Sequence, residues 1–212
     1  MGGIGKPCYA RPMEYSFLRG LGMSAALIVA IGAQNAFVLR AGLRREHVLA
    51  VVLVCAFSDA LLITLGVLGV GTLVQGSPVL LAVARYGGAA FLVGYGALAA
   101  RRAWRGSSLT PADAPPSSLR EALGTCLALT YLNPHCWLDT VVVLGAVAGQ
   151  LPAPQRTAFG LGATAASFVW FFALGYGARL LRGVFARPAA WRWLDGAIAL
   201  VMWSIAASLL LA

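Results

Sequence analysis

Tyr131–Thr140 reads YLNPHCWLDT and places an amide, a proline, an imidazole and a carboxylate inside a long apolar stretch. Polar and ionisable groups are costly at bilayer depth, so they face a bundle interior or a wet cavity and usually mark an ion or substrate path. Pro134 lacks an amide hydrogen and clashes with the preceding helical turn. The segment therefore predicts a membrane helix that is kinked or broken at Pro134, with Asn133 at the break.

The composition predicts an all-α integral membrane protein. The chain of 212 residues is 60% hydrophobic and only 11% charged, whereas soluble domains are about 25% charged. A membrane span needs about 20 mostly apolar residues. Six stretches qualify, at residues 17–39, 48–74, 79–100, 119–148, 158–178 and 193–212.

The basic residues behind the net charge of +9 indicate how the chain is oriented in the membrane, because most arginines fall between these stretches. The first, third and fifth connections hold Arg40, Arg44, Arg45, Arg101, Arg102, Arg105, Arg120, Arg179, Arg182, Arg187 and Arg192. The other side holds Arg19, Arg85 and Arg156, with Lys6 and Arg11 if the first residues are translated. By the positive-inside rule, the arginine-rich connections are cytoplasmic and both termini lie outside.

A transporter domain at residues 16–212 follows an N-terminal extension at 1–15, in which Met13 is a candidate authentic start. A Pro- and Ser-rich, flexible cytoplasmic connector at 101–118 divides the domain into three-span groups at 16–100 and 119–212. The groups resemble each other weakly: residues 56–60 can be set against 166–170, and 34–35 against 133–134. Because each group has an odd number of spans, the two groups enter the membrane with opposite orientations, which makes them inverted repeats. Coincidence between Ala-, Gly- and Leu-rich helices is the alternative.

Asp59, with Ser58 beside it, lies near the middle of the second stretch. A carboxylate at that depth must be protonated, paired across helices or bound to a cation. We interpret Asp59 as a candidate for cation recognition or proton coupling. A structural bond between helices is the alternative.

His135 and Asp139 are four residues apart, so on a continuous helix they share one face and could relay a proton. Alternatively, Asp139 pins a neighbouring helix and His135 is a core histidine with satisfied hydrogen bonds. Gln34 and Asn35, which follow a second predicted irregularity at Gly32, either line the path or hold helices together.

Several kinds of site are excluded by residue counts. Lys6 is the only lysine, so a phosphate-binding GxxxxGK[ST] loop is absent, and His47 and His135 are the only histidines, so HExxH and multi-histidine metal sites are absent. The four cysteines form no CxxC pair. We predict neither an enzyme nor a metal or organic cofactor.

Four runs together resemble the lysine exporter (LysE) family, which includes the arginine exporter. They are Val29–Arg40 with Gly42–His47, Cys55–Ile63, Gly88–Leu92 with Tyr95 and Gly96, and Thr130–Thr140. The resemblance implies a secondary exporter of amino acids, lysine and arginine first, in the bacterial cytoplasmic membrane. Related homoserine, threonine and leucine exporters share the architecture, so a neutral substrate is the alternative. A membrane thiol or redox carrier is a more remote alternative function.

Export of a cationic amino acid from a cell that is negative inside costs about 2.3 kcal/mol per charge per 100 mV. A steep outward gradient, proton antiport or hydroxide symport must therefore drive it. Asp59 and Asp139 are the groups that could bind either the substrate cation or a proton. The expected partners are amino acids and the lipid bilayer, and the GxxxG run at Gly145–Gly149 indicates close helix packing or a homo-oligomer.

Overall fold

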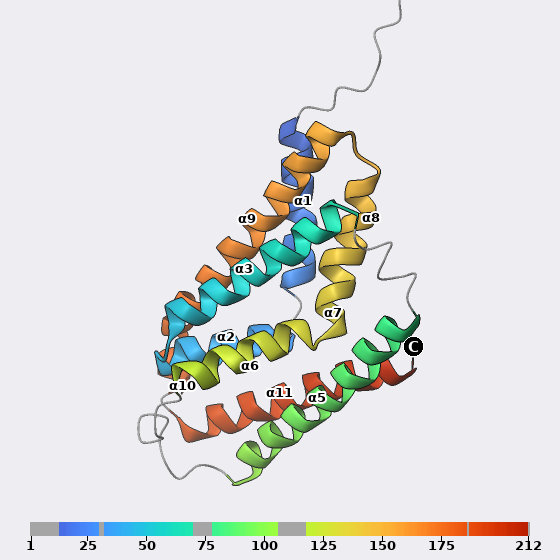
Figure 1. The fold of residues 1–212 in the computed structure, drawn as a ribbon. Coiled ribbons are helices and arrows are strands. Elements are labelled where there is room, and N and C mark those ends of the chain that lie inside the picture. The colour runs from blue at the N-terminus through green and yellow to red at the C-terminus, as the bar shows by residue number, and fades with distance from the viewer. Residues whose placement is uncertain (1–12, 30–31, 70–77, 106–117, 186, 212) are drawn as a thin grey trace, which may run out of the picture.

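A computed structural model describes residues 13–29, 32–69, 78–105, 118–185 and 187–211. Every regular element in these ranges is helical (Figure 1). In chain order they are α1 (Met13–Ile28), α2 (Ala33–Arg44), α3 (Val48–Val67), α5 (Pro78–Arg105), α6 (Leu119–Tyr131), α7 (Pro134–Trp137), the π-helix η1 (Leu138–Val143), α8 (Leu144–Gly149), α9 (Ala153–Gly177), the 3₁₀-helix η2 (Ala178–Leu181), α10 (Arg182–Phe185) and α11 (Pro188–Leu211).

Two of the predicted spans are broken. The first bends by 81° between α1 and α2, around Gly32. The other is interrupted between the end of α6 at Tyr131 and the start of α7 at Pro134. Both predicted irregularities are therefore confirmed, and each half of the chain carries one in its first helical segment.

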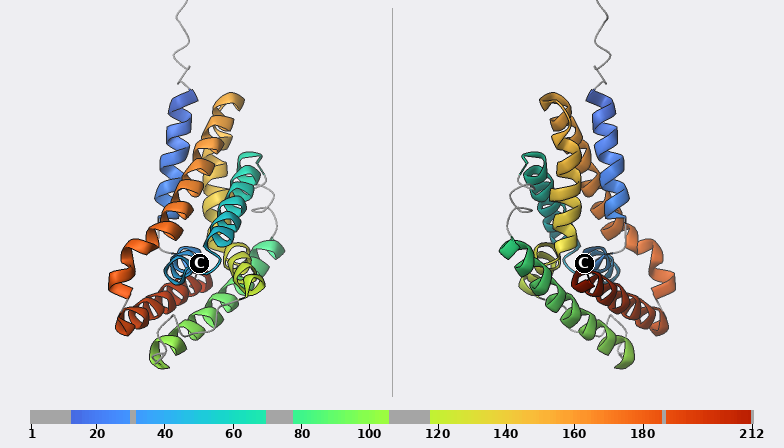
Figure 2. Two further views of the ribbon diagram at one scale, coloured as in Figure 1. Left: turned by 90° about the vertical axis from the view of Figure 1, so that its left-hand side faces the viewer. Right: turned by 90° about the vertical axis from the view of Figure 1, so that its right-hand side faces the viewer.

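Helix α1 runs beside the first part of the longer helix α9 (Figure 2). Glycines at the crossing make this possible: a Cβ at Gly20 would lie 2.0 Å from the Phe159 carbonyl oxygen, and one at Gly162 would lie 2.0 Å from the Phe17 carbonyl oxygen. Small residues let membrane helices approach closely. These backbones touch because neither glycine has a side chain.

The predicted GxxxG run has a role inside the chain. A Cβ at Gly145 would lie 2.7 Å from the Gly66 carbonyl oxygen, whereas one at Gly149 would meet nothing within 4 Å. Gly145 therefore packs α8 against α3, which supports the interpretation of close helix packing for this glycine.

Helices α5 and α11 form a second pair, below α2 and α6 in Figure 1. A core of small and aliphatic side chains joins this pair to the rest of the molecule. It includes Ala33 and Ala36 of α2, Leu129 of α6, Leu92 of α5 and Met202 of α11, all buried. Helix α2, the second half of the first broken span, thus lies between the pair α5 and α11 and the remaining helices.

Two helices, Val48–Val67 and Ala153–Leu181, are each long and apolar enough to cross a membrane, and the bent pair α1 and α2 makes a third candidate. The arrangement of six spans as inverted repeats stays a prediction. Helix α5 continues to Arg105, so residues 101–105 of the predicted flexible connector are helical. Residues 106–117 of that connector and 1–12 of the N-terminal extension lie outside the described residues.

Candidate functional site

A cavity of about 260 Å³ lies where the two broken spans meet. Protein sites for small molecules usually measure about 300–1,000 Å³, so this one suits a single small metabolite. Its walls come from both breaks, from α3 and from α11. The polar side chains that line it are Ser24, Gln34, Asn35, Asp59, Asn133, Asp139 and Thr140.

Asp59 reaches the cavity from α3 and is only 5% exposed. The Ser167 hydroxyl on α9 donates a hydrogen bond of 3.1 Å to its Oδ2 atom. The bond between helices that the sequence left as an alternative for Asp59 is present, and the carboxylate lines the cavity as well. Ser58 is also buried, but it is not among the residues that line the cavity.

Asn35 holds the first break together. Its Nδ2 donates to the Ile28 carbonyl at the end of α1, and its Oδ1 accepts a hydrogen bond of 3.1 Å from Trp170 Nε1 on α9. One amide thus joins the two halves of the broken span to a third helix. Asn35 therefore holds helices together and also lines the cavity, while its part in a transport path stays a prediction.

Gln34, the preceding residue, has a different environment. Its Oε1 lies 3.8 Å from the Cys136 thiol, which is placed to donate to it. Its Nε2 is buried and has no hydrogen-bond partner within the described ranges. The acceptor that this amide faces is the Asp59 carboxylate.

The second break contributes Asn133, which is 3% exposed, and Asp139, which is half-buried. Asp139 lies in η1, where the Leu144 N–H donates to the Asp139 carbonyl five residues back. The helix that carries His135 and Asp139 changes from α- to π-winding after Trp137, and the shared face of these two side chains stays a prediction. The side chains of His135 and Pro134 lie outside the described residues. Single π-turns of this kind occur frequently at functional sites.

The described ionisable side chains that line the cavity include two carboxylates and no basic group. Asp59 and Asp139 both line it, and none of its described lining residues is Lys, Arg or His. Such a wall attracts cations and repels free anions. Within the described ranges, no group of three His, Cys, Asp or Glu side chains is arranged to hold a metal ion.

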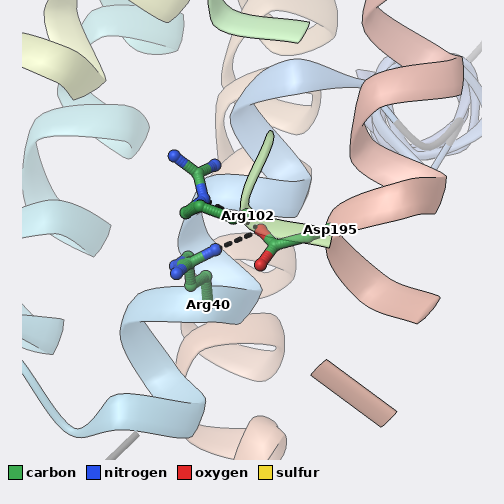
Figure 3. Close-up of polar contacts among 3 residues, drawn as sticks. All are labelled: Arg40, Arg102 and Asp195. Carbon is green, nitrogen blue, oxygen red and sulfur yellow. Dashed lines mark hydrogen bonds and ion pairs between the residues drawn. The ribbon is translucent and has the colours of Figure 1, made fainter. Parts of the chain in front are cut away.

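An ion cluster that sequence reasoning missed joins α2, α5 and α11 (Figure 3). Asp195 of α11 pairs with Arg40 of α2 and, at 3.2 Å, with Nε of Arg102 of α5. We interpreted both arginines as charges of cytoplasmic connections, a prediction that did not include their pairing with a carboxylate that is itself 5% exposed. The only signal in the sequence was an aspartate near the start of the last apolar stretch, and its nearest candidate partner was Arg192, three residues before it.

The cluster also has aromatic support. The Arg40 guanidinium lies 5.9 Å from the centre of the Trp191 ring, and that of Arg102 lies 5.8 Å from the centre of Tyr95. Arg102 Nη2 is buried without a hydrogen-bond partner in the part of the chain that the structure describes. Aromatic faces attract guanidinium groups, so both arginines are positioned by more than their ion pairs.

Cys55 of α3 and Cys126 of α6 lie with their sulfur atoms 3.1 Å apart in the core, and both are free thiols. They come from different halves of the chain, a proximity that the sequence did not predict. Neither lines the cavity, whereas Cys136 does. The expected role as small buried hydrophobic residues fits the location of the pair, among Val51, Val52 and Phe171.

Comparison with known proteins identifies the family. Residues 25–212 match the family described as LysE type translocator. A protein of Mycobacterium tuberculosis (strain H37Rv), provisionally named an amino-acid transporter, is 52% identical over 180 residues, which cover 85% of this chain and 89% of that protein.

Two proteins named arginine exporter protein ArgO are also similar. The one from Yersinia enterocolitica is 45% identical over 90% of this chain and 93% of its own length. The one from Serratia proteamaculans is 44% identical over 91% of this chain and 95% of its own length. No solved structure matches. The extent of these matches shows that the chain is a membrane transporter rather than an enzyme, and that it belongs to the LysE type translocator family.

Proposed function

We propose that this protein is a secondary exporter of basic amino acids, arginine or lysine, in the bacterial cytoplasmic membrane. The observation that carries the proposal is the cavity between the broken spans, lined by Asp59 and Asp139 and by no described Lys, Arg or His. A substrate with a cationic side chain is what such a wall recognises. The names of the relatives from Yersinia enterocolitica and Serratia proteamaculans point to the same substrate class.

The architecture that we propose for this function is six membrane spans in two inverted three-helix repeats, with the substrate between them. Support comes from the two breaks, one in each half, that meet at one cavity. It also comes from the bond between Asp59 and Ser167, which joins the two segments that the sequence comparison set against each other. Broken helices at the interface of inverted repeats form the binding sites of many secondary transporters.

Coupling to protons follows from the energetics. Moving one positive charge outward against 100 mV costs about 2.3 kcal/mol, and a carboxylate that releases the substrate cation can take up a proton in its place. We assign this exchange to Asp59 and Asp139, with a proton or an equivalent hydroxide as the coupling ion. No cofactor is needed for it.

Counterflow into proteoliposomes tests the proposal. Vesicles loaded with unlabelled arginine should take up labelled arginine, and external lysine should compete while leucine and threonine should not. Asp59→Asn and Asp139→Asn should each slow this exchange and flatten its dependence on pH. Glu121→Gln, which neutralises an exposed carboxylate at the start of α6, is the matched control.

Two results would contradict the proposal. If leucine or threonine competes as well as lysine, the substrate is a neutral amino acid. If both aspartate variants exchange arginine at the wild-type rate with an unchanged pH dependence, the cavity carboxylates have no part in recognition or coupling.

A further inference from the structure

The segment from η2 to the first turns of α11 carries positive charge without negative charge. Residues 178–194 read ARLLRGVFARPAAWRWL and hold four arginines and no Asp or Glu. The next carboxylate along the chain, Asp195, is already paired with Arg40 and Arg102. Arg187 is exposed, and no carboxylate of the described ranges lies within ion-pair distance of it. This arginine-rich segment can therefore bind an anion from outside the chain.

A groove of about 700 Å³ lies along this segment, where α10 meets the start of α11 (Figure 1). One wall is α10, with Val184 and Phe185, and the other is the first turns of α11, with Trp193 and Leu194. Among the described residues that line the groove, Arg187 is the only one that is ionisable. The groove therefore combines an apolar wall with a single cation.

The cation lies at one end of the groove. Helix α11 begins at Pro188, directly after Arg187, and Ala197 lines the groove roughly 14 Å farther along the helix axis. The N-terminal end of α11 adds a partial positive charge beside Arg187. Because the last predicted membrane span begins at residue 193, the groove runs from the arginine-rich segment into that span. A molecule that fits it has an anionic head and an apolar tail.

Exposed tryptophans lie at the same end of the molecule. Trp193 in the groove wall is 81% exposed, and Trp104 near the end of α5 is 89% exposed. The two helices meet here, because Arg192 Nε donates a hydrogen bond of 3.0 Å to the Ala103 carbonyl oxygen. Tryptophan side chains gather at the level of the lipid headgroups. Their exposure here indicates that the charged end of the groove lies at that level.

We propose that the groove between α10 and α11 binds one anionic phospholipid, with its phosphate at Arg187 and an acyl chain along Trp193, Leu194 and Ala197. The phosphate supplies the negative charge that the arginine-rich segment lacks, and the acyl chain covers the apolar wall. Basic pockets between membrane helices bind anionic headgroups in this way. A zwitterionic phospholipid has the same acyl chains, but its own ammonium group offsets the phosphate. The site is separate from the central cavity, and it does not depend on which amino acid the protein exports.

Native mass spectrometry of the purified protein measures bound lipid directly. The protein in detergent micelles is titrated with phosphatidylglycerol, or with phosphatidylcholine that has the same acyl chains. The wild-type protein should bind phosphatidylglycerol at least about fivefold more tightly, in keeping with the contribution of one basic group beside an anionic headgroup. Equal affinity for the two lipids would overturn the proposal.

Arg187→Gln should remove the preference for phosphatidylglycerol and leave the affinity for phosphatidylcholine unchanged. Arg101→Gln is the matched control, because it removes the same charge from an exposed position of α5 outside the groove. This control should keep the wild-type preference. If Arg187→Gln keeps the preference as well, or if both variants lose it equally, the lipid is attracted by the basic surface as a whole and the groove site is wrong.

The acyl chain is tested by filling the groove. Ala197→Trp leaves Arg187 in place and should abolish the tight binding of phosphatidylglycerol, whereas Ala207→Trp, at an exposed position of α11 outside the groove, should not. Inorganic phosphate and the deacylated headgroup should not displace the bound lipid, and displacement by either would identify a site for a free anion instead. If Ala197→Trp removes a dimer from the spectra and leaves lipid binding intact, the groove is an interface between copies and the proposal is wrong.

Discussion

Replacing Asp195 by asparagine should destabilise the protein by several kcal/mol, although Asp195 lies outside the cavity wall. The substitution keeps the size of the side chain and removes its charge. Arg40 and Arg102 then share no carboxylate. Their side chains are 18% and 36% exposed, and that of Asp195 is 8% exposed.

The expected magnitude differs for the two ion pairs. Breaking a buried pair by removing one partner costs about 3–5 kcal/mol, which applies to Arg40. The pair with Arg102 is closer to a surface pair, worth about 0–1 kcal/mol. Since 1 kcal/mol shifts Tm by about 2–4 °C in a chain of this size, Asp195→Asn should lower Tm by roughly 10 °C.

Thermal unfolding of the purified protein in detergent micelles measures this shift. Glu14→Gln, an exposed carboxylate in the first turn of α1, changes the net charge equally and should shift Tm much less. The double variant Arg40→Gln with Asp195→Asn should lose less than the sum of the single losses, because both single variants remove the same ion pair between Arg40 and Asp195. A Tm loss for Asp195→Asn no larger than that for Glu14→Gln would refute the reasoning.

Two further predictions concern packing and the first break. Gly162→Ala should sharply reduce the yield of monodisperse protein in size-exclusion chromatography, because the new Cβ would lie 2.0 Å from the Phe17 carbonyl oxygen. Gly149→Ala, whose new Cβ would meet nothing within 4 Å, should leave the yield unchanged. Equal yields of the two variants would contradict the backbone contact between α1 and α9. Trp170→Phe removes the hydrogen bond to the Asn35 oxygen and should lower the unfolding free energy by about 1–3 kcal/mol. Trp193→Phe, at an 81% exposed position, should change thermal stability little. Similar losses in the two variants would argue against the bond to Asn35.

Sequence reasoning succeeded where a local signal was strong. Pro134 cannot continue a helix, and Gly32 precedes two amides that are unusual in an apolar stretch, so both breaks could be located. Costly polar groups in lipid had to face one interior, and Asp59 and Asp139 do line a single cavity.

What could not be predicted depends on contacts between distant segments. Arg40 and Asp195 are 155 positions apart, and nothing local distinguishes Arg40 from an ordinary arginine after a span. The sequence also carried no local signal for the π-winding at Asp139. For the same reason the sequence suggested one continuous α-helix through His135 and Asp139, whereas the winding changes after Trp137.

A break in a membrane span also poses a problem of backbone hydrogen bonding, since lipid offers no partner for the groups that it frees. At the end of α1 a side chain supplies a hydrogen-bond partner, because Asn35 Nδ2 donates to the Ile28 carbonyl. At the start of α2 no side chain caps the helix, and the nearby amide of Gln34 faces the Asp59 carboxylate. A side chain thus compensates the Ile28 carbonyl at the end of α1, whereas the N-cap residue of α2 provides no such compensation.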